Sequence, residues 1–247
     1  MIRRPPRSTQ SRSSAASDVY KRQEMNHIAE LICLLAALWN YKYLKGTIYF
    51  YFIYYLAFVL YGELGASYFK YVLSLTLKPE DRNNMHIYLW VWAVMDAFLS
   101  YFLYTEIRNV FVRKLITVFT SLLVCYFLFL FFFFKHYVEP CYYGFVVETF
   151  YLIILCCIYF YELFLHSEEG DSIWTLPAFW VIAGIFIFFT GTSISSVMHG
   201  VLKNFSTQIM GLPLYSFIAQ VLCVFLYGCP VVAFILLRKE KQARLFN

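Results

Sequence analysis

Four acidic residues lie inside stretches of sequence that are otherwise apolar: Glu30, Glu63, Asp96 and Glu148. An ionisable side chain is costly to bury in a membrane-spanning segment, so such a residue usually marks a ligand or proton site. When the apolar stretches are threaded across a bilayer, Glu30, Glu63 and Glu148 fall in its outer third and Asp96 near its middle. We therefore predict an outward-facing, ligand-binding polar pocket with Asp96 at its floor.

These side chains also have a purely structural interpretation. The chain contains 22 tyrosines, whose hydroxyl groups can donate hydrogen bonds to carboxylates on neighbouring helices. His27, His86 and His199 lie at the same helix ends, and imidazoles combined with carboxylates can bind zinc. The sequence has no HExxH motif and no CxxC pair, so we predict no metal site and no cofactor. A fifth carboxylate, Glu162, is expected at an inner helix end in contact with water.

The elements that must hold these residues are membrane-spanning helices. Hydrophobic residues make up 61% of the 247 residues and charged residues only 14%, whereas a soluble domain carries about 25% charged residues. Seven apolar stretches are long enough to cross a ~30 Å hydrocarbon core, where helices satisfy their own backbone hydrogen bonds. We predict an all-α fold, a polytopic transmembrane bundle of seven helices. The predicted spans are Asn26–Leu44, Thr47–Ala66, His86–Glu106, Lys114–Phe134, Gly144–Leu165, Pro177–Val197 and Pro213–Leu237.

The positions of Lys and Arg predict the orientation of this bundle, because cytoplasmic loops carry an excess of these residues. The loops and the terminus on one side hold nine: Lys42, Lys45, Arg108, Arg113, Lys114, Arg238, Lys239, Lys241 and Arg244. The loops on the other side hold five: Lys70, Lys78, Arg82, Lys135 and Lys203. We therefore predict an N-terminus outside the cell and a C-terminus in the cytoplasm.

Residues 1–23 differ from the rest of the chain, because they are basic, rich in Ser, Arg and Pro, and poor in apolar residues. Their six Lys and Arg against one Asp give +5, which equals the net charge of the whole chain. The remainder is therefore neutral, and we predict no nucleic-acid partner. The segment resembles translated sequencing-adapter read-through, so we expect it to be disordered and foreign to the protein. We predict a transmembrane domain over 24–240 and a cytoplasmic tail over 241–247.

Several short motifs are spread over residues 26–240. They are Glu63, Asn84, Tyr88, Tyr161-Glu162-Leu163, Leu176-Pro177-Ala178-Phe179-Trp180-Val181 and Gly184. With these motifs the chain resembles a family of bacterial seven-helix inner-membrane proteins with no assigned activity. Members of that family are similar to membrane-sensor modules often found near histidine kinases. The resemblance implies a bacterial inner-membrane location and a signalling context, and it supplies no substrate or catalytic residue.

The first functional hypothesis is therefore an integral membrane protein that acts as a non-enzymatic sensor or accessory signalling subunit. A small ligand or the membrane lipids would bias helix packing around Glu63, Asp96 and Glu148, and the inner loops and basic tail would pass the change to a signalling protein partner. No nucleophile–base pair of recognisable spacing occurs, which favours a non-enzymatic role. The sequence does not fix the oligomeric state.

Two other classes of protein fit the same sequence. A membrane-embedded metal-dependent lipid hydrolase would use carboxylates and histidines to hold a metal-activated water, and it requires His86 or His199 to converge with two carboxylates. A small-solute transporter requires a central cavity lined by Asp96.

Overall fold

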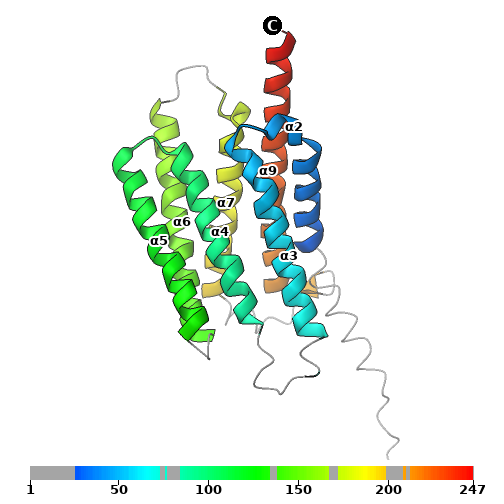
Figure 1. Cartoon of the computed structure of the whole chain (residues 1–247), viewed down its shortest axis with the longest axis vertical. Helices are drawn as coiled ribbons and strands as arrows, with labels where there is room; N and C mark the ends of the chain where they lie inside the picture. The colour runs from blue at the N-terminus through cyan, green and yellow to red at the C-terminus, as the bar shows by residue number, and fades with distance from the viewer. Residues whose placement is uncertain are drawn as a thin grey trace, which may run out of the picture.

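Helices make up nearly all of the regular structure. The computed structural model describes residues 26–72, 76, 84–133, 138–166, 172–198, 208–209 and 212–246. The elements in these ranges are a helix over Asn26–Trp39, α2 (Tyr41–Leu44), η1 (Ile48–Phe50), α3 (Tyr51–Tyr71), α4 (Met85–Glu106), α5 (Val110–Phe133), α6 (Val138–His166), η4 (Ile173–Thr175), α7 (Pro177–Val197), β1 (Gln208–Ile209), β2 (Leu212–Pro213) and α9 (Leu214–Phe246) (Figure 1). Strands β1 and β2 form a two-residue antiparallel pair.

Six of these helices are long and apolar enough to cross a membrane. In each of these helices, no more than half of the residues in the apolar 18-residue segment are buried inside the protein. Large apolar side chains therefore cover much of the outer surface. A water-soluble monomer rarely exposes apolar patches of more than a few hundred Å². The architecture therefore indicates a multi-pass membrane protein. The six candidate spans are Ile48–Phe69, Met85–Glu106, Val110–Phe133, Tyr143–His166, Pro177–Val197 and Ser216–Arg244.

The first predicted span, Asn26–Leu44, is divided in the structure. Its helix ends at Trp39 and has fewer than 18 residues, and the chain turns at Asn40. The Asn40 side chain donates a hydrogen bond from Nδ2 to the Ala36 carbonyl (2.8 Å), and such local bonds compete with helix continuation. After α2, Gly46 adopts a φ of +83°, which residues with a side chain rarely adopt. The prediction of one helix through Leu44 was therefore wrong.

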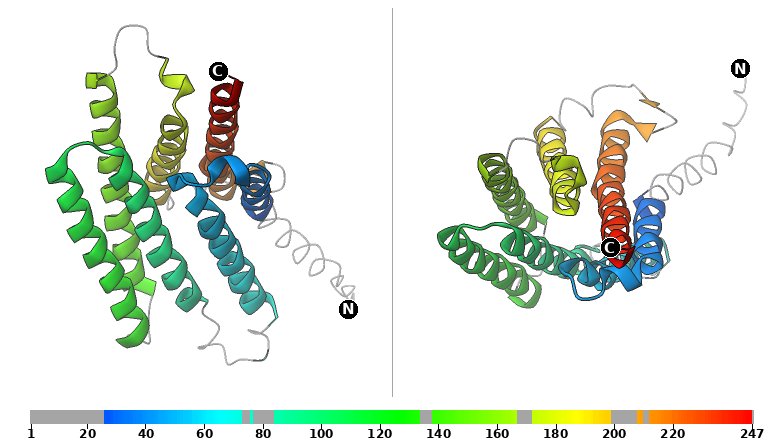
Figure 2. Two further views of the ribbon diagram at one scale, coloured as in Figure 1. Left: turned by 45° about the horizontal axis from the view of Figure 1, so that its top comes forward. Right: turned by 90° about the horizontal axis from the view of Figure 1, so that it is seen from above.

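The helices are arranged in two rows. Seen from above, α3, α4 and α5 form one row and α6, α7 and α9 the other, while the helix Asn26–Trp39 lies beside α3 and α9 (Figure 2). Helix α4 packs against α3, α5 and α6, so its buried face looks across the interior toward the second row. Asp96, Leu99 and Phe102 are all buried on this helix.

Helices α7 and α9 pack closely because a glycine removes the side chain at their contact. A Cβ built on Gly184 would lie 2.8 Å from Cβ of Cys229 and 3.0 Å from the Phe225 carbonyl oxygen. Small residues of this kind let helix backbones approach each other in membranes. The contact holds α9 against the bundle at the level of Pro230, which lies inside the helix.

Helix α9 is longer than the membrane is thick. Its 33 residues correspond to about 50 Å of helix, whereas the hydrocarbon core measures ~30 Å. Its C-terminal end projects beyond the neighbouring helices (Figure 1). There, Nζ of Lys241 donates to the Lys45 carbonyl (3.1 Å) and Nε2 of Gln242 donates to the Tyr43 hydroxyl (3.2 Å). The predicted tail therefore continues the last helix as far as Phe246.

Candidate functional site

The four predicted carboxylates fall into two groups on different helices. Glu30, on the first helix, and Glu63, on α3, make up the first group, and Asp96, on α4, and Glu148, on α6, make up the second. Asp96 and Glu148 are fully buried, Glu30 is 3% exposed and Glu63 is half-buried. Their common burial supports treating them as a candidate site, since buried ionisable groups in a membrane are expensive.

The first group lies where three helices meet. Nδ1 of His27 is 3.9 Å from Oε2 of Glu30, and Nε2 of the same ring is 3.3 Å from the Ser67 hydroxyl on α3. The Tyr88 hydroxyl on α4 donates to Oε2 of Glu63 (3.2 Å). Glu30 and Glu63 are close enough for their charges to repel one another. This group therefore connects three helices through polar contacts at one end of the bundle.

The second group lies on α4 and α6, and neither of its acids forms an ion pair with a histidine among the described residues. The Ser100 hydroxyl donates to Oδ1 of Asp96 (3.3 Å). Among the described residues, Oδ2 of Asp96 and both carboxylate oxygens of Glu148 accept no hydrogen bond. The salt bridges in the described ranges involve other acids, Glu30 and Glu240. Asp96 and Glu148 also lie within electrostatic range of each other, so the bundle interior holds two acidic groups without a basic partner.

A buried tyrosine lies near one member of each group. Tyr55 of α3 has a hydroxyl with no hydrogen-bond partner among the described residues. It lies within electrostatic range of both Glu30 and Glu148. The structure thus brings the predicted carboxylates together in pairs, with Tyr55 near both pairs. The assignment of all four to one ligand pocket stays a prediction.

Hydroxyl groups extend from the second group toward the surface of the bundle. The Tyr151 hydroxyl on α6 is 2.9 Å from the Thr120 hydroxyl on α5 and also donates to the Ile116 carbonyl (3.3 Å). Ser100 could have been found from the sequence, because it follows Asp96 by four residues and so shares its helix face. Tyr55 and Tyr151 carry no such signal among 22 tyrosines.

Three further residues from the sequence prediction have separate positions. The His86 ring packs edge-on against Phe69, with ring centroids 4.9 Å apart, and His199 lies outside the described residues. Glu162 accepts hydrogen bonds from the backbone amides of Arg108 (2.7 Å) and Asn109 (3.1 Å), at the start of α5. A carboxylate at a helix N-terminus is favourable, so Glu162 stabilises this turn while remaining partly exposed.

The metal-dependent hydrolase needs three ligands that converge. Within the part of the chain that the structure describes, no group of three His, Cys, Asp or Glu side chains is placed to hold a metal ion. The described geometry therefore gives the hydrolase hypothesis no positive support.

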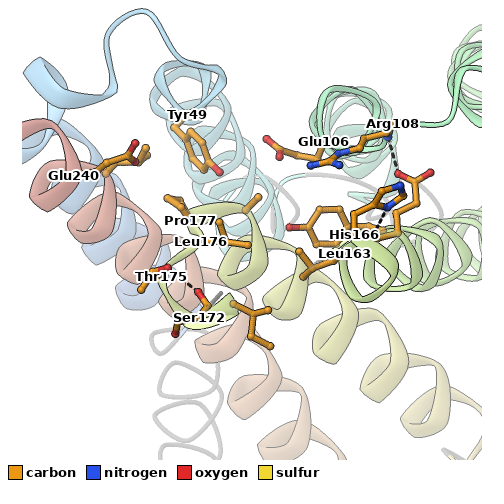
Figure 3. A pocket seen from close by; sticks show the side chains of 15 residues that line it. Tyr49, Glu106, Arg108, Leu163, His166, Ser172, Thr175, Leu176, Pro177 and Glu240 are labelled. Carbon is orange, nitrogen blue, oxygen red and sulfur yellow. Dashed lines mark hydrogen bonds between the residues drawn. The ribbon is translucent and has the colours of Figure 1, made fainter. Parts of the chain in front are cut away.

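A cavity of about 480 Å³ opens at the end of the bundle from which α9 projects (Figure 3). Glu106 of α4 and Glu240 of α9 lie on opposite sides of it, and Tyr49 lies between them. The other residues that line it are Arg108, Tyr159, Glu162, Leu163, His166, Ser172, Ile173, Thr175, Leu176, Pro177, Ala178 and Leu237. The cavity was not foreseen from the sequence, because its lining comes from six separate elements, η1, α4, α6, η4, α7 and α9, and from residues beside them.

Comparison of the chain with models of protein families, with curated proteins and with solved structures finds no match. The fold and the site define a class only, a multi-pass helical membrane protein with acidic groups buried between its helices. Any function must therefore be argued from the geometry described above.

Proposed function

We propose that this chain is a seven-span protein of a bacterial inner membrane that acts as a non-enzymatic sensor or accessory signalling subunit. In this proposal the short helix Asn26–Trp39 also crosses the membrane and brings the six candidate spans to seven. The N-terminus is then outside and the C-terminus is in the cytoplasm. Two observations support this topology. The helix Asn26–Trp39 starts at the end of the bundle opposite to the end of α9 (Figure 1). The nine Lys and Arg lie in α2 and just after it, in the turn between α4 and α5 and the first residues of α5, and near the end of α9. These segments lie at the same end of the bundle (Figure 1).

The continuity of α9 is the observation that carries the sensor proposal. In its N-terminal half, Cys223 and Tyr227 lie within electrostatic range of Glu30 and Glu63. Its C-terminal end projects from the bundle with the basic residues Arg238, Lys239, Lys241 and Arg244. One continuous helix thus connects the buried acidic residues to a surface that a signalling partner could contact.

The carboxylate oxygens of Asp96 and Glu148 that have no hydrogen-bond donor among the described residues are groups that a ligand could bind. Glu148 has no hydrogen-bond donor among the described residues, so a ligand that supplied a donor or a positive charge would stabilise the packing in which it fits. A ligand shifts a conformational equilibrium only by its differential affinity for the two states. The 480 Å³ cavity beside Leu237 and Glu240 leaves room for the end of α9 to change position.

The proposal is tested by measuring whether the buried acids control the position of α9. Nitroxide labels are introduced as unnatural amino acids at Val110, at the start of α5, and Ala243, two exposed positions, and their distance distribution is measured by pulsed electron paramagnetic resonance in lipid nanodiscs. We expect Glu63→Gln and Glu148→Gln to shift this distribution, because each changes the charge near α9 or its neighbours. The matched control is Lys114→Gln, which changes an exposed charge on α5 and should leave the distribution as in the unmodified protein.

The outcome can contradict the proposal even if one variant fails to fold. Glu63 is only half-buried and hydrogen-bonded to Tyr88, so Glu63→Gln should assemble normally if Glu148→Gln does not. Distance distributions identical to the unmodified protein in every assembled variant would refute the sensor role of these acids.

A further inference from the structure

A groove lined by residues of α4 and α5 lies between these two helices, and α5 is at the edge of the bundle (Figures 1 and 2). It consists of two adjoining hollows of about 300 and 430 Å³, which share Ala97 and Tyr101 in their linings. One hollow is lined mainly by hydroxyl-bearing side chains, completed by Tyr104, Ile116, Thr117, Thr120 and Ser121. The other is almost entirely apolar, completed by Trp90, Ala93, Val94, Phe98, Val124 and Leu128. Hydroxyl groups are therefore concentrated at one end of the groove, its polar end, whereas apolar surface lines its whole length.

A fixed positive charge lies near the polar end. The Arg113 guanidinium lies over the Tyr104 ring, 5.5 Å from its centroid, and its Nε donates to the Ile107 carbonyl (2.5 Å). The hydrogen bonds between described residues use neither terminal amino group of Arg113. Lys114, the next residue, is exposed. A guanidinium held in this way presents its two terminal amino groups in the planar geometry that binds phosphate.

We propose that this groove binds one anionic glycerophospholipid. The phosphate pairs with Arg113, the ester groups lie beside the Tyr101 and Tyr104 hydroxyls, and an acyl chain follows the apolar hollow past Ala97 to Trp90. The order of charge, hydroxyl and apolar surface along the groove is the order of the parts of such a lipid. The helical rise from Tyr104 to Trp90 is about 21 Å, which exceeds half of a ~30 Å hydrocarbon core and so accommodates a long acyl chain.

The location of the groove fits this occupant better than a second copy of the chain. Its polar end lies at the end of the bundle where the Lys and Arg gather, which is the level of the lipid headgroups. An apolar helix from another copy would leave the Tyr101 and Tyr104 hydroxyls and the Arg113 charge without partners. This inference does not depend on the sensor proposal, because it involves neither the buried acids nor α9.

The test uses phospholipids that carry a photoreactive diazirine on an acyl chain. The full chain is placed in phosphatidylcholine nanodiscs that contain a trace of either labelled phosphatidylglycerol or labelled phosphatidylcholine, and the crosslinked peptides are identified by mass spectrometry. We expect the anionic lipid to label the α4 and α5 groove residues about five-fold more, the factor that corresponds to ~1 kcal/mol for a basic residue at the membrane surface.

Two sets of variants separate a specific site from general lipid contact. Arg113→Gln should abolish the preference for the anionic lipid, whereas Lys114→Gln, the adjacent charge, should retain most of it. Arg113→Lys keeps the charge but loses the planar guanidinium, so it should retain only part of the preference. Ala97→Leu should reduce labelling by both lipids because it fills the shared part of the groove, whereas Ala57→Leu on the exposed face of α3 should not.

Three results would overturn the proposal. Equal labelling by both lipids would show bulk contact only, and an equal loss in Arg113→Gln and Lys114→Gln would show general surface attraction. Groove peptides that neither lipid labels, in a protein that native mass spectrometry shows to be a dimer, would assign the groove to an oligomer interface.

Discussion

Glu148 on α6 lies fully buried within electrostatic range of Asp96 on α4, and neither of its carboxylate oxygens accepts a hydrogen bond from a described residue. Two acidic groups in this position repel each other whenever both are ionised, and little water is present to screen them. An unpaired ionised group in an apolar interior is also far more costly than a neutral amide. The pair thus lowers the stability of the bundle whenever both groups are ionised.

The first prediction concerns this repulsion. We expect Glu148→Gln and Asp96→Asn each to raise the midpoint of thermal unfolding in detergent at pH 8, because either change removes one of the two like charges. The double variant should gain less than the sum of the two single changes, by about 1 kcal/mol, which is typical of residues in contact. The measurement is a double-mutant cycle of unfolding free energies.

The same cycle contains its own controls. At pH 5 the gain should be smaller, because protonation already removes charge from carboxyl groups. Glu240→Gln changes a carboxyl that is about half exposed and should alter stability by no more than about 0.5 kcal/mol. Additive effects of the two buried variants would mean that the two acids do not interact.

The second prediction concerns the contact between α7 and α9. Gly184→Ala places a Cβ 2.8 Å from Cβ of Cys229 and 3.0 Å from a backbone oxygen, so the two helices must separate. We expect a loss of about 1–3 kcal/mol, as for other overpacked interiors, measured as the change in unfolding free energy in detergent.

A matched glycine shows whether the loss comes from packing. Gly65 lies inside α3, and a Cβ built there meets nothing within 4 Å. Gly65→Ala should therefore be neutral or slightly stabilising, because alanine is the better helix former. If both glycine variants lost the same stability, the close contact at Gly184 would not be what holds these helices together.

Hydropathy predicted where the chain crosses the membrane better than where its helices end. The last predicted span stops at Leu237, where the charged residues begin, yet α9 continues to Phe246. Residues 238–245 are Arg, Lys, Glu, Gln, Ala and Leu, which are all strong helix formers. At the other end of the chain, Asn40 interrupts an apolar run because its side chain bonds to the helix backbone. Helix propensity at one boundary and a side-chain hydrogen bond at the other determine where these helices end, and a hydropathy profile contains neither property.

The sequence predicted which acids are buried, but it did not predict which of them lie near each other. The cost of burial alone identifies Glu30, Asp96 and Glu148, and all three are buried. Which acids face one another depends on the rotation of each helix about its axis, and a helix that is apolar on every side gives no signal for that rotation. The pairing of Asp96 with Glu148 therefore emerges only when α4 packs on α6.

The third prediction concerns the topology of the chain. Thr76, which follows α3, and Ala243, near the end of α9, are both exposed. The five candidate spans α4, α5, α6, α7 and α9 lead from one to the other, and this odd number places the two residues in different compartments. In intact cells a membrane-impermeant maleimide should react with Thr76→Cys above the level of the unmodified protein. It should react with Ala243→Cys only after permeabilisation. Reaction of both variants in intact cells would exclude the proposed orientation.

A third cysteine variant tests whether lipid surrounds the helices. The Val118 side chain is 57% exposed on α5, but in a bilayer it would face acyl chains instead of water. Maleimides react with the thiolate, which is strongly disfavoured in hydrocarbon. Val118→Cys should therefore stay unlabelled both before and after permeabilisation and should react once the protein is unfolded. Rapid reaction in the folded protein would mean that this apolar surface contacts water, and the membrane-spanning assignment of α5 would have to be abandoned.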